Sequence, residues 1–226
     1  MSELHLTGRW IMLQVTATLS RVAVVGRVRA STRSVVLYDV VHRDGRLRGE
    51  GRLLHMQIDN GRAPVKIRIP DAFRRAIPPS NLNAEIRTEA DGRVRLVQPR
   101  AWTVLGAKLE DPIHEPLPTG ANDPRVWDQD EDGHPGVTIH VDGMVRGDIY
   151  VIQRSWSALD GVQTAPDAFK GKVTFGQEQV ILGASNVFLK TAPRNTPDPK
   201  RSMFQMVRVA PNATDSEALA VLEGQM

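Results

Sequence analysis

The chain contains no cysteine among its 226 residues, and this excludes disulfide bridges, thiolate metal sites and cysteine nucleophiles. Aromatic residues make up only 5% of the sequence, so a core must be built mainly from valine, isoleucine, leucine and methionine. No run of about 18 apolar residues is present, which excludes a transmembrane helix. The first residues lack the basic and apolar regions of a secretory signal peptide. Either the protein is cytoplasmic, or a leader has been removed and it belongs to the periplasm or cell envelope.

Common catalytic motifs are missing as well. The sequence has no Gly-x-Ser-x-Gly, no Gly-x-Gly-x-x-Gly, no Walker-type loop and no His-Glu-x-x-His. A serine nucleophile at a strand-helix turn, a phosphate-cradling loop and a helical zinc site are therefore not expected. The motifs do not favour an enzyme.

The balance of charge changes along the chain. Residues 1–110 hold 19 lysines and arginines against 10 acidic residues, whereas residues 111–226 hold 10 against 16. Either the N-terminal half presents a basic face to phosphates or anionic lipid, or the genome favours arginine codons. The arginines are spread over many predicted strands and aromatic residues for stacking are scarce, so nucleic acid is not the expected partner.

Alternating apolar and polar residues predict many short strands, most clearly over residues 11–19. Asp44-Gly45 marks a hairpin, because it supplies the positive φ that tight turns need. Turns that recur about every 8–12 residues predict an all-β barrel or sandwich with about 10–12 strands, and of the two we expect an antiparallel β-barrel. Short helices are expected near residues 71–77 and 215–223, the second after a capping box of Thr214 and Glu217.

We expect residues 1–226 to form a single domain. Residues 111–126 contain four prolines and no apolar periodicity, so they predict a linker loop between two halves, 1–110 and 127–226. A hairpin pattern in the first half resembles one in the second, as it would in two related half-barrels. General hairpin statistics explain that similarity equally well, so both interpretations stay open.

An acidic loop in the second half has the spacing of a cation site. Asp128, Asp130 and Asp132 occupy its positions 1, 3 and 5, and Gly133 occupies position 6. This spacing in a tight turn directs alternate carboxylates to one centre, and His134 would add its backbone carbonyl from position 7. The sequence therefore predicts a structural Ca²⁺ site rather than a catalytic one.

The loop departs from the EF-hand pattern at position 12. Ile139 stands where a bidentate glutamate would be, and a strand follows instead of a helix. Further ligands would have to come from Glu131, Asp123 or Asp142. A solvated acidic turn without an ion is the alternative interpretation.

The tryptophans are the candidates for ligand binding. Trp10, Trp102 and Trp156 are expected to plug the ends of the barrel or to line a cavity. Gly8-Arg9-Trp10 resembles the Gly-x-Trp that starts the first strand of lipocalins, where the tryptophan closes the barrel floor. That resemblance implies that Arg208, near the end of the last strand, packs over Trp10. It also implies a barrel that encloses one small apolar ligand.

A second resemblance covers residues 128–209. The block reads D-x-D-x-D-G-x-P-G-V-T, then G-D-I-Y-V-I-Q-R, E-Q-V-I-L-G-A-S-N and D-P-x-R-S-x-F-x-M-V-R-V. It is similar to uncharacterised exported or lipoprotein-type β domains of bacteria, although this chain departs from them in having no cysteine. The resemblance implies a removed leader and implies no activity.

These observations lead to one main functional hypothesis and two alternatives. The main hypothesis is a non-enzymatic exported or cell-envelope protein with a structural calcium site and a small apolar ligand. The first alternative is a hydrolase or isomerase whose site is assembled from scattered strands of a lipocalin-like barrel. The second is binding to nucleic acid or an anionic surface through the arginine-rich N-terminal half.

Overall fold

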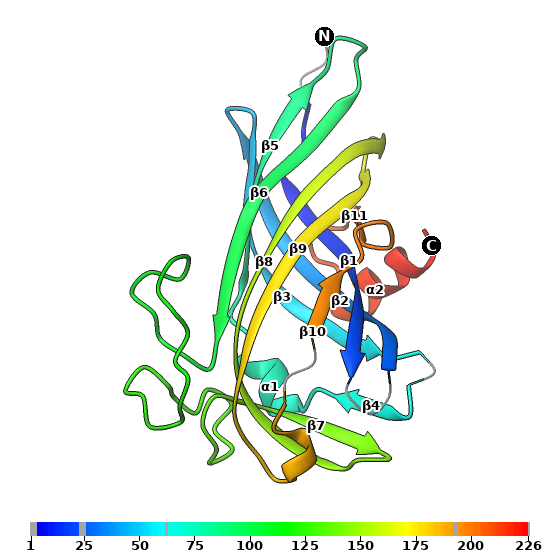
Figure 1. The fold of residues 1–226 in the computed structure, drawn as a ribbon. Coiled ribbons are helices and arrows are strands. Elements are labelled where there is room, and N and C mark those ends of the chain that lie inside the picture. Colours follow the sequence, from blue (N-terminus) through cyan, green and yellow to red (C-terminus); the bar gives the residue numbers. More distant parts are fainter. Residues whose placement is uncertain (1–3, 23–25, 62, 192–193, 226) are drawn as a thin grey trace.

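The computed structural model describes residues 4–22, 26–61, 63–191 and 194–225 (Figure 1). Within these ranges the chain is all-β, and none of its helices is long and apolar enough to cross a bilayer. The strands are β1 (Gly8–Val22), β2 (Gly26–Arg43), β3 (Arg46–Asp59), β4 (Val65–Arg68), β5 (Ser80–Thr88), β6 (Val94–Leu105), β7 (Val137–Gly143), β8 (Gly147–Ala165), β9 (Ala168–Ala184), β10 (Arg194–Pro197) and β11 (Met203–Val209). The helices are α1 (Asp71–Ala76), the 3-10 turn η1 (Val187–Leu189) and α2 (Asp215–Glu223). The predicted all-β class and both predicted helices are confirmed.

Eight of the strands form a ring. Their order is β8, β6, β5, β3, β2, β1, β11 and β9, and β9 pairs again with β8. The ring strands follow one another in chain order, as in an up-and-down meander, and every pairing is antiparallel. Strands from both sides of the 111–126 loop share this ring, which gives the molecule its predicted barrel-like shape (Figure 1).

The inner face of the ring is filled at the end that contains Trp10, which we call the packed end. Trp10 is fully buried, and its indole N–H donates to the Leu6 carbonyl at 2.9 Å. All eight ring strands contribute buried side chains around it: Met12, Tyr38, Val40, Leu47, Leu82, Ala84, Ile86, Leu96, Leu159, Phe169, Val173, Phe204 and Met206. Gly51 is required here, because a Cβ at that position would lie 2.5 Å from the Tyr38 ring. Burial of this apolar surface is the main stabilising contribution at the packed end.

Helix α2 covers part of the outer face of the ring (Figure 1). The Thr214 hydroxyl accepts the Glu217 N–H and the Glu217 carboxylate accepts the Thr214 N–H, so the predicted capping box is present. Ala218 and Leu222 are buried against a cluster that includes Ile11 of β1. Neighbouring residues of β1 therefore pack into two different cores: Trp10 into the core on the inner face and Ile11 into the core on the outer face.

Strands β4 and β7 extend the sheet at the end of the ring opposite the packed end, and helix α1 lies at the same end (Figure 1). β7 pairs with the start of β8, and β4 pairs with β7. Phe73 of α1 is buried in a cluster with Leu105 and Val151. This cluster fixes α1 against the end of the ring.

The long connection between β6 and β7 lies against β8. Arg154 donates to the backbone carbonyl of Glu115 at 2.7 Å, and Leu117 is buried beside Ile152. Arg125 binds Asp123 and Glu115, both at 2.7 Å. The predicted 111–126 loop is therefore a packed segment, held largely by polar contacts.

Candidate functional site

The acidic loop closes on itself through main-chain contacts. Asp128 accepts the N–H groups of Asp132 and Gly133, at 3.1 and 2.8 Å. Gly133 has a φ of 87°, which an L side chain rarely adopts. The Gly136 N–H donates to the Trp127 carbonyl at 3.0 Å and closes the base of the loop. These contacts explain why the aspartates at alternate positions point to one centre.

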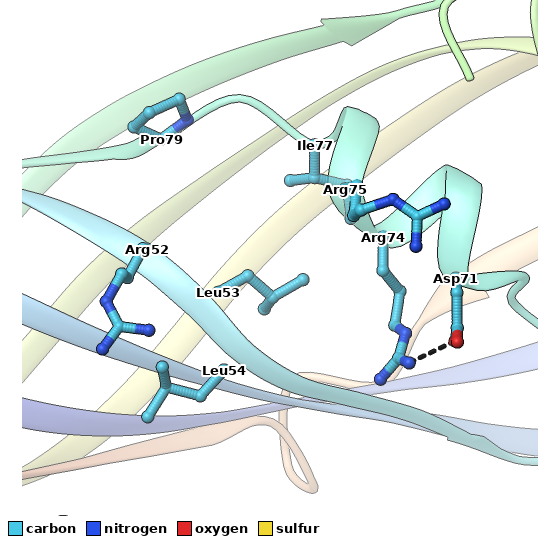
Figure 2. A pocket seen from close by; sticks show the side chains of 8 residues that line it. All are labelled: Arg52, Leu53, Leu54, Asp71, Arg74, Arg75, Ile77 and Pro79. Carbon is cyan, nitrogen blue, oxygen red and sulfur yellow. Dashed lines mark hydrogen bonds and ion pairs between the residues drawn. The ribbon is translucent and has the colours of Figure 1, made fainter. Parts of the chain in front are cut away.

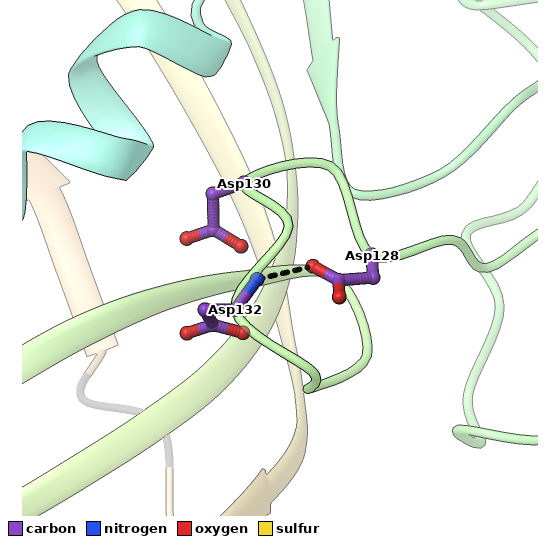
Figure 3. A group of neighbouring side chains, drawn as sticks. All are labelled: Asp128, Asp130 and Asp132. Carbon is purple, nitrogen blue, oxygen red and sulfur yellow. Dashed lines mark hydrogen bonds between the residues drawn. The ribbon is translucent and has the colours of Figure 1, made fainter.

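Asp128, Asp130 and Asp132 come together as their spacing predicts (Figure 3). One side-chain oxygen from each residue lies within 4.8 Å of the others. Oxygen ligands of one calcium ion, each at about 2.3–2.6 Å from it, are at most about 5 Å apart. A single cation could therefore contact all three carboxylates.

Asp130 is the buried member of the cluster, with 7% of its surface exposed. Its Oδ2 accepts the Thr138 N–H at 2.9 Å, whereas Oδ1 is buried and has no hydrogen-bond partner within the described ranges. Burial raises the pKa of Asp130 above its usual range, the charges of Asp132 and Asp128 add to this, and the Thr138 N–H opposes it. A negative charge on the carboxylate in this position lowers the stability of the fold unless a cation neutralises it.

His134 contributes differently from the three aspartates. Its ring is stacked on Tyr150, with 4.0 Å between the ring centroids and 15° between the planes. The backbone N–H of His134 donates to Asp132 Oδ1 at 2.9 Å. The predicted contribution of His134 through its backbone carbonyl is compatible with this placement, because the ring is engaged elsewhere.

Two of the acidic residues that were expected to add ligands are engaged in ion pairs outside the cluster. Asp123 binds Arg125, and Asp142 pairs with Arg68 and Arg146. Glu131 is exposed and has a φ of 58°. Among the residues that the structure describes, the three aspartates alone form the side-chain cluster, so main-chain carbonyls and water would have to complete the coordination of an ion.

Gln129 connects this loop to two other elements. Its side-chain N–H donates to the Ala76 carbonyl at the end of α1, at 2.7 Å, and its Oε1 accepts the Gly106 N–H at 2.6 Å. Asp130 adds the bond to Thr138 of β7. The acidic loop therefore joins the ends of β6 and α1 to the start of β7.

Arg208 packs over Trp10, as the lipocalin resemblance implied. Its guanidinium carbon lies 4.7 Å from the centroid of the Trp10 ring. The guanidinium also donates to Asp167 and to the carbonyls of His5 and Thr7. Trp10 is fully buried under this cover, so the pair closes the packed end.

Trp102 and Trp156 form a separate pair. They are direct cross-strand neighbours on β6 and β8, with ring centroids 6.2 Å apart, and Arg100 lies over Trp156 at 4.1 Å. A bulge in β6 after Gln98 shifts the alternation, so both tryptophans face away from the side that carries Leu159 of the inner core. The tryptophans expected to bind a ligand therefore lie in two places, inside the packed end and on the outer face.

A third feature was not expected from the sequence. Two adjoining hollows of about 370 and 570 Å³ lie between β3 on one side and α1 with β4 on the other, and both are lined by Asp71 and Arg74. The available signal was the Pro78-Pro79 pair that ends α1, together with basic residues on β3, α1 and β4. We call this feature the β3 groove.

No protein-family model matches the chain, and neither a curated protein nor a solved structure gives a significant match. The resemblances to exported bacterial β domains and to lipocalins therefore stay predictions. The features that bear on function are the carboxylate cluster, the Trp10–Arg208 and Trp102–Trp156 pairs, and the β3 groove.

Proposed function

We propose that the protein is a non-enzymatic, barrel-like binding protein whose acidic loop is locked by one calcium ion. The observation that carries this proposal is Asp130 Oδ1, a buried carboxylate oxygen to which no described residue donates a hydrogen bond, within a cluster of three carboxylates. Such a cluster is destabilised by mutual repulsion and by burial, and a bound cation removes both penalties.

Calcium fits the ligand types better than other common metals. The cluster supplies only oxygen atoms, which are the preferred ligands of calcium and magnesium, and zinc sites in proteins usually include cysteine or histidine. An irregular loop with carbonyl and water ligands suits the flexible coordination of calcium better than the strict octahedron of magnesium. The His134 carbonyl is the main-chain ligand that we propose.

The ion would act as a structural lock. Gln129 lies between two of the ligands in sequence and bonds to the ends of α1 and β6, and Asp130 accepts the N–H of Thr138 at the start of β7. Fixing Asp128, Asp130 and Asp132 around one ion thus fixes three elements that are distant in sequence. The ion would stabilise the end of the ring opposite Trp10.

A structural ion of this kind supports a location outside the cytoplasm. Three carboxylates without a bidentate glutamate form a weaker site than an EF-hand sensor, in the range of extracellular modules, with a dissociation constant of about 10⁻⁴–10⁻³ M. Such a site is filled only where calcium is plentiful. This agrees with the exported or cell-envelope location that the sequence resemblance implies.

The inner face of the ring supports the non-enzymatic part of the proposal. Beyond the packed end, alternate residues of β8 and β9 share the face of Leu159 and Val173. These residues are Gln153, Ser155 and Ser157 of β8 and Phe175, Gln177 and Gln179 of β9. The Gln177 side chain donates to Gln153 and Gln179. Amide and hydroxyl groups at these positions provide hydrogen bonds but no general acid or base.

Thermal unfolding with and without calcium tests the proposal. At ten times the dissociation constant, calcium should add about 1.4 kcal/mol to the free energy of unfolding, which raises Tm by about 3–6 °C. The Asp130→Asn variant keeps an oxygen for the Thr138 N–H but loses the charge, so its Tm should not respond to calcium. Asp44→Asn, at an exposed hairpin turn, is the matched control and should respond like the wild type. A wild-type Tm that is unchanged by calcium would reject the proposal.

A further inference from the structure

The β3 groove runs beside a part of the β3 edge that has no strand partner among the described residues. β3 pairs with β5 only from Arg46 to Gly51, where Gly51 faces Ser80. Continuing the same register would place Pro79 opposite Arg52, and proline has no N–H to donate, so the ladder stops there. Within the described ranges, residues 52–59 of β3 pair with β2 alone.

The opposite wall of the groove is formed by α1 and β4. Figure 2 shows Leu53 of β3 and Ile77 after α1 in the space between the two walls. The first hollow lies beside Arg52, Leu53 and Leu54, and the second beside residues 56–61 of β3 and the following turn. The two hollows together follow the free edge over its length.

The straight part of the free edge lies beside the second hollow. The pairing of β2 with β3 shifts at a bulge between Val35 and Val36, which is opposite residues 53–55 of β3. Bulges bend a strand and interrupt its use as a pairing edge. Residues 55–59 follow the bulge, and at about 3.3 Å per residue they offer an edge about 16 Å long.

The lining of the groove carries a net positive charge. Six cationic side chains line the two hollows against two carboxylates, those of Asp59 and Asp71; the cations are Arg33, Arg52, Lys66, Arg68, Arg74 and Arg75. Arg52, Arg68 and Arg74 pair with aspartates. Within the part of the chain that the structure describes, no carboxylate pairs with Lys66 or Arg75, which are both exposed. The local charge therefore favours an acidic ligand.

A buried acceptor in the second hollow points to a ligand with N–H groups. Asn60 lines this hollow and is only 9% exposed. Its Nδ2 donates to the Val65 carbonyl at 3.3 Å, whereas its Oδ1 is buried without a hydrogen-bond partner among the described residues. Buried amide oxygens are normally paired, so a ligand N–H that reached this atom would satisfy it.

We propose that the β3 groove binds an extended acidic segment of a partner protein, which adds as a strand to residues 55–59 of β3. Main-chain hydrogen bonds to the free edge would give affinity, as in other cases of strand addition. Carboxylates of the segment would lie near Lys66, Arg74 and Arg75. Its apolar side chains, at alternate positions, would contact Met56, Ile58 and Ile67, which line the second hollow.

A simple polyanion would use the same cations but not the strand edge. Nucleic acid and anionic lipid have no main-chain N–H and C=O groups to match β3, and neither would order along residues 55–59. The proposal is also independent of the calcium lock, because none of the three loop aspartates lines the groove.

Fluorescence anisotropy with a labelled peptide tests this proposal. The probe is a peptide of alternating glutamate and valine with both termini blocked. Its length of about six residues matches that of the straight edge. It should bind the wild-type protein at low salt, with the same affinity in excess EDTA as in calcium. A peptide of the same sequence with N-methyl groups at alternate residues should bind at least about tenfold more weakly, because it lacks strand hydrogen bonds.

A charge-reversal variant and its control complete the experiment. Lys66→Glu with Arg75→Glu should weaken peptide binding at least about tenfold, since it reverses the exposed charge of the groove. Arg43→Glu with Arg48→Glu makes the same charge change at exposed residues outside the groove. This control variant should retain most of the wild-type affinity for the peptide. Equal binding of the N-methylated peptide, or tighter binding of a thymidine oligonucleotide of equal charge, would overturn strand addition. Loss of the calcium response in Tm would leave this proposal unaffected.

Discussion

The two ends of the ring are stabilised by different kinds of interaction. At the packed end, Trp10 lies among apolar side chains from all eight ring strands, under the guanidinium of Arg208. At the opposite end, an apolar cluster around Phe73 is joined by polar and charged contacts of Arg154, Gln129 and Asp130, which hold the 106–136 connection. Apolar packing is insensitive to pH and ions, whereas the polar end should respond to both. One fold thus combines an apolar end with an end whose stability depends on solution conditions.

The largest effect should follow from removing the packed core. Trp10→Ala deletes a fully buried ring and should lower the free energy of unfolding by about 3–5 kcal/mol. Calcium should still add as much to the free energy of unfolding of this variant as to that of the wild type, because the ion acts at the other end. Urea unfolding with and without calcium measures both quantities. A calcium response that disappears in Trp10→Ala would show that the two ends are not independent.

A smaller effect is expected at Gln129, which links the acidic loop to α1 and β6. Gln129→Ala removes the bonds to the Ala76 carbonyl and the Gly106 N–H, at a cost of about 1–2 kcal/mol. Amide hydrogen exchange should be faster in α1 and at the start of the 106–136 connection and unchanged around Trp10. Equal acceleration at both ends would argue against a local role for Gln129.

The smallest effect should be a dependence on pH in the same connection. The guanidinium and N–H of Arg125 lower the pKa of Asp123 to about 2, from an ordinary value of 3.8. Because the folded-state pKa is depressed, the stabilisation is complete above about pH 4 and is lost as the pH falls towards 2. The difference in Tm between the wild type and Asp123→Asn should therefore shrink as the pH falls from 4 to 2. The difference in Tm between the wild type and Trp10→Ala should not shrink in this way as the pH falls.

Alternation and turn chemistry were enough to predict the all-β class and both helices. Period-two patterns such as residues 11–19 of β1 determine which face is buried, and Thr214 with Glu217 determines where α2 begins. Closure of β1 on β11 depends on contacts between residues about 190 positions apart. No local pattern specifies such a pairing, so the order of the ring came from the structure alone.

The candidate site was predictable only in part. The spacing of Asp128, Asp130 and Asp132 predicts their convergence, but it does not distinguish the buried Asp130 from its exposed neighbour Asp132. Burial of Asp130 depends on β7, whose Thr138 N–H it accepts. The bulge after Gln98 placed Trp102 on the outer face, and a one-residue shift of this kind is not visible in the alternation.

Equilibrium dialysis against calcium measures the central claim most directly. The wild-type chain should bind one ion at saturation, with a dissociation constant of about 10⁻⁴–10⁻³ M. Asp130→Asn should lose this binding, while Asp44→Asn should retain it. Absence of bound calcium in the wild type at millimolar concentrations, or equal binding by Asp130→Asn, would contradict the proposed lock.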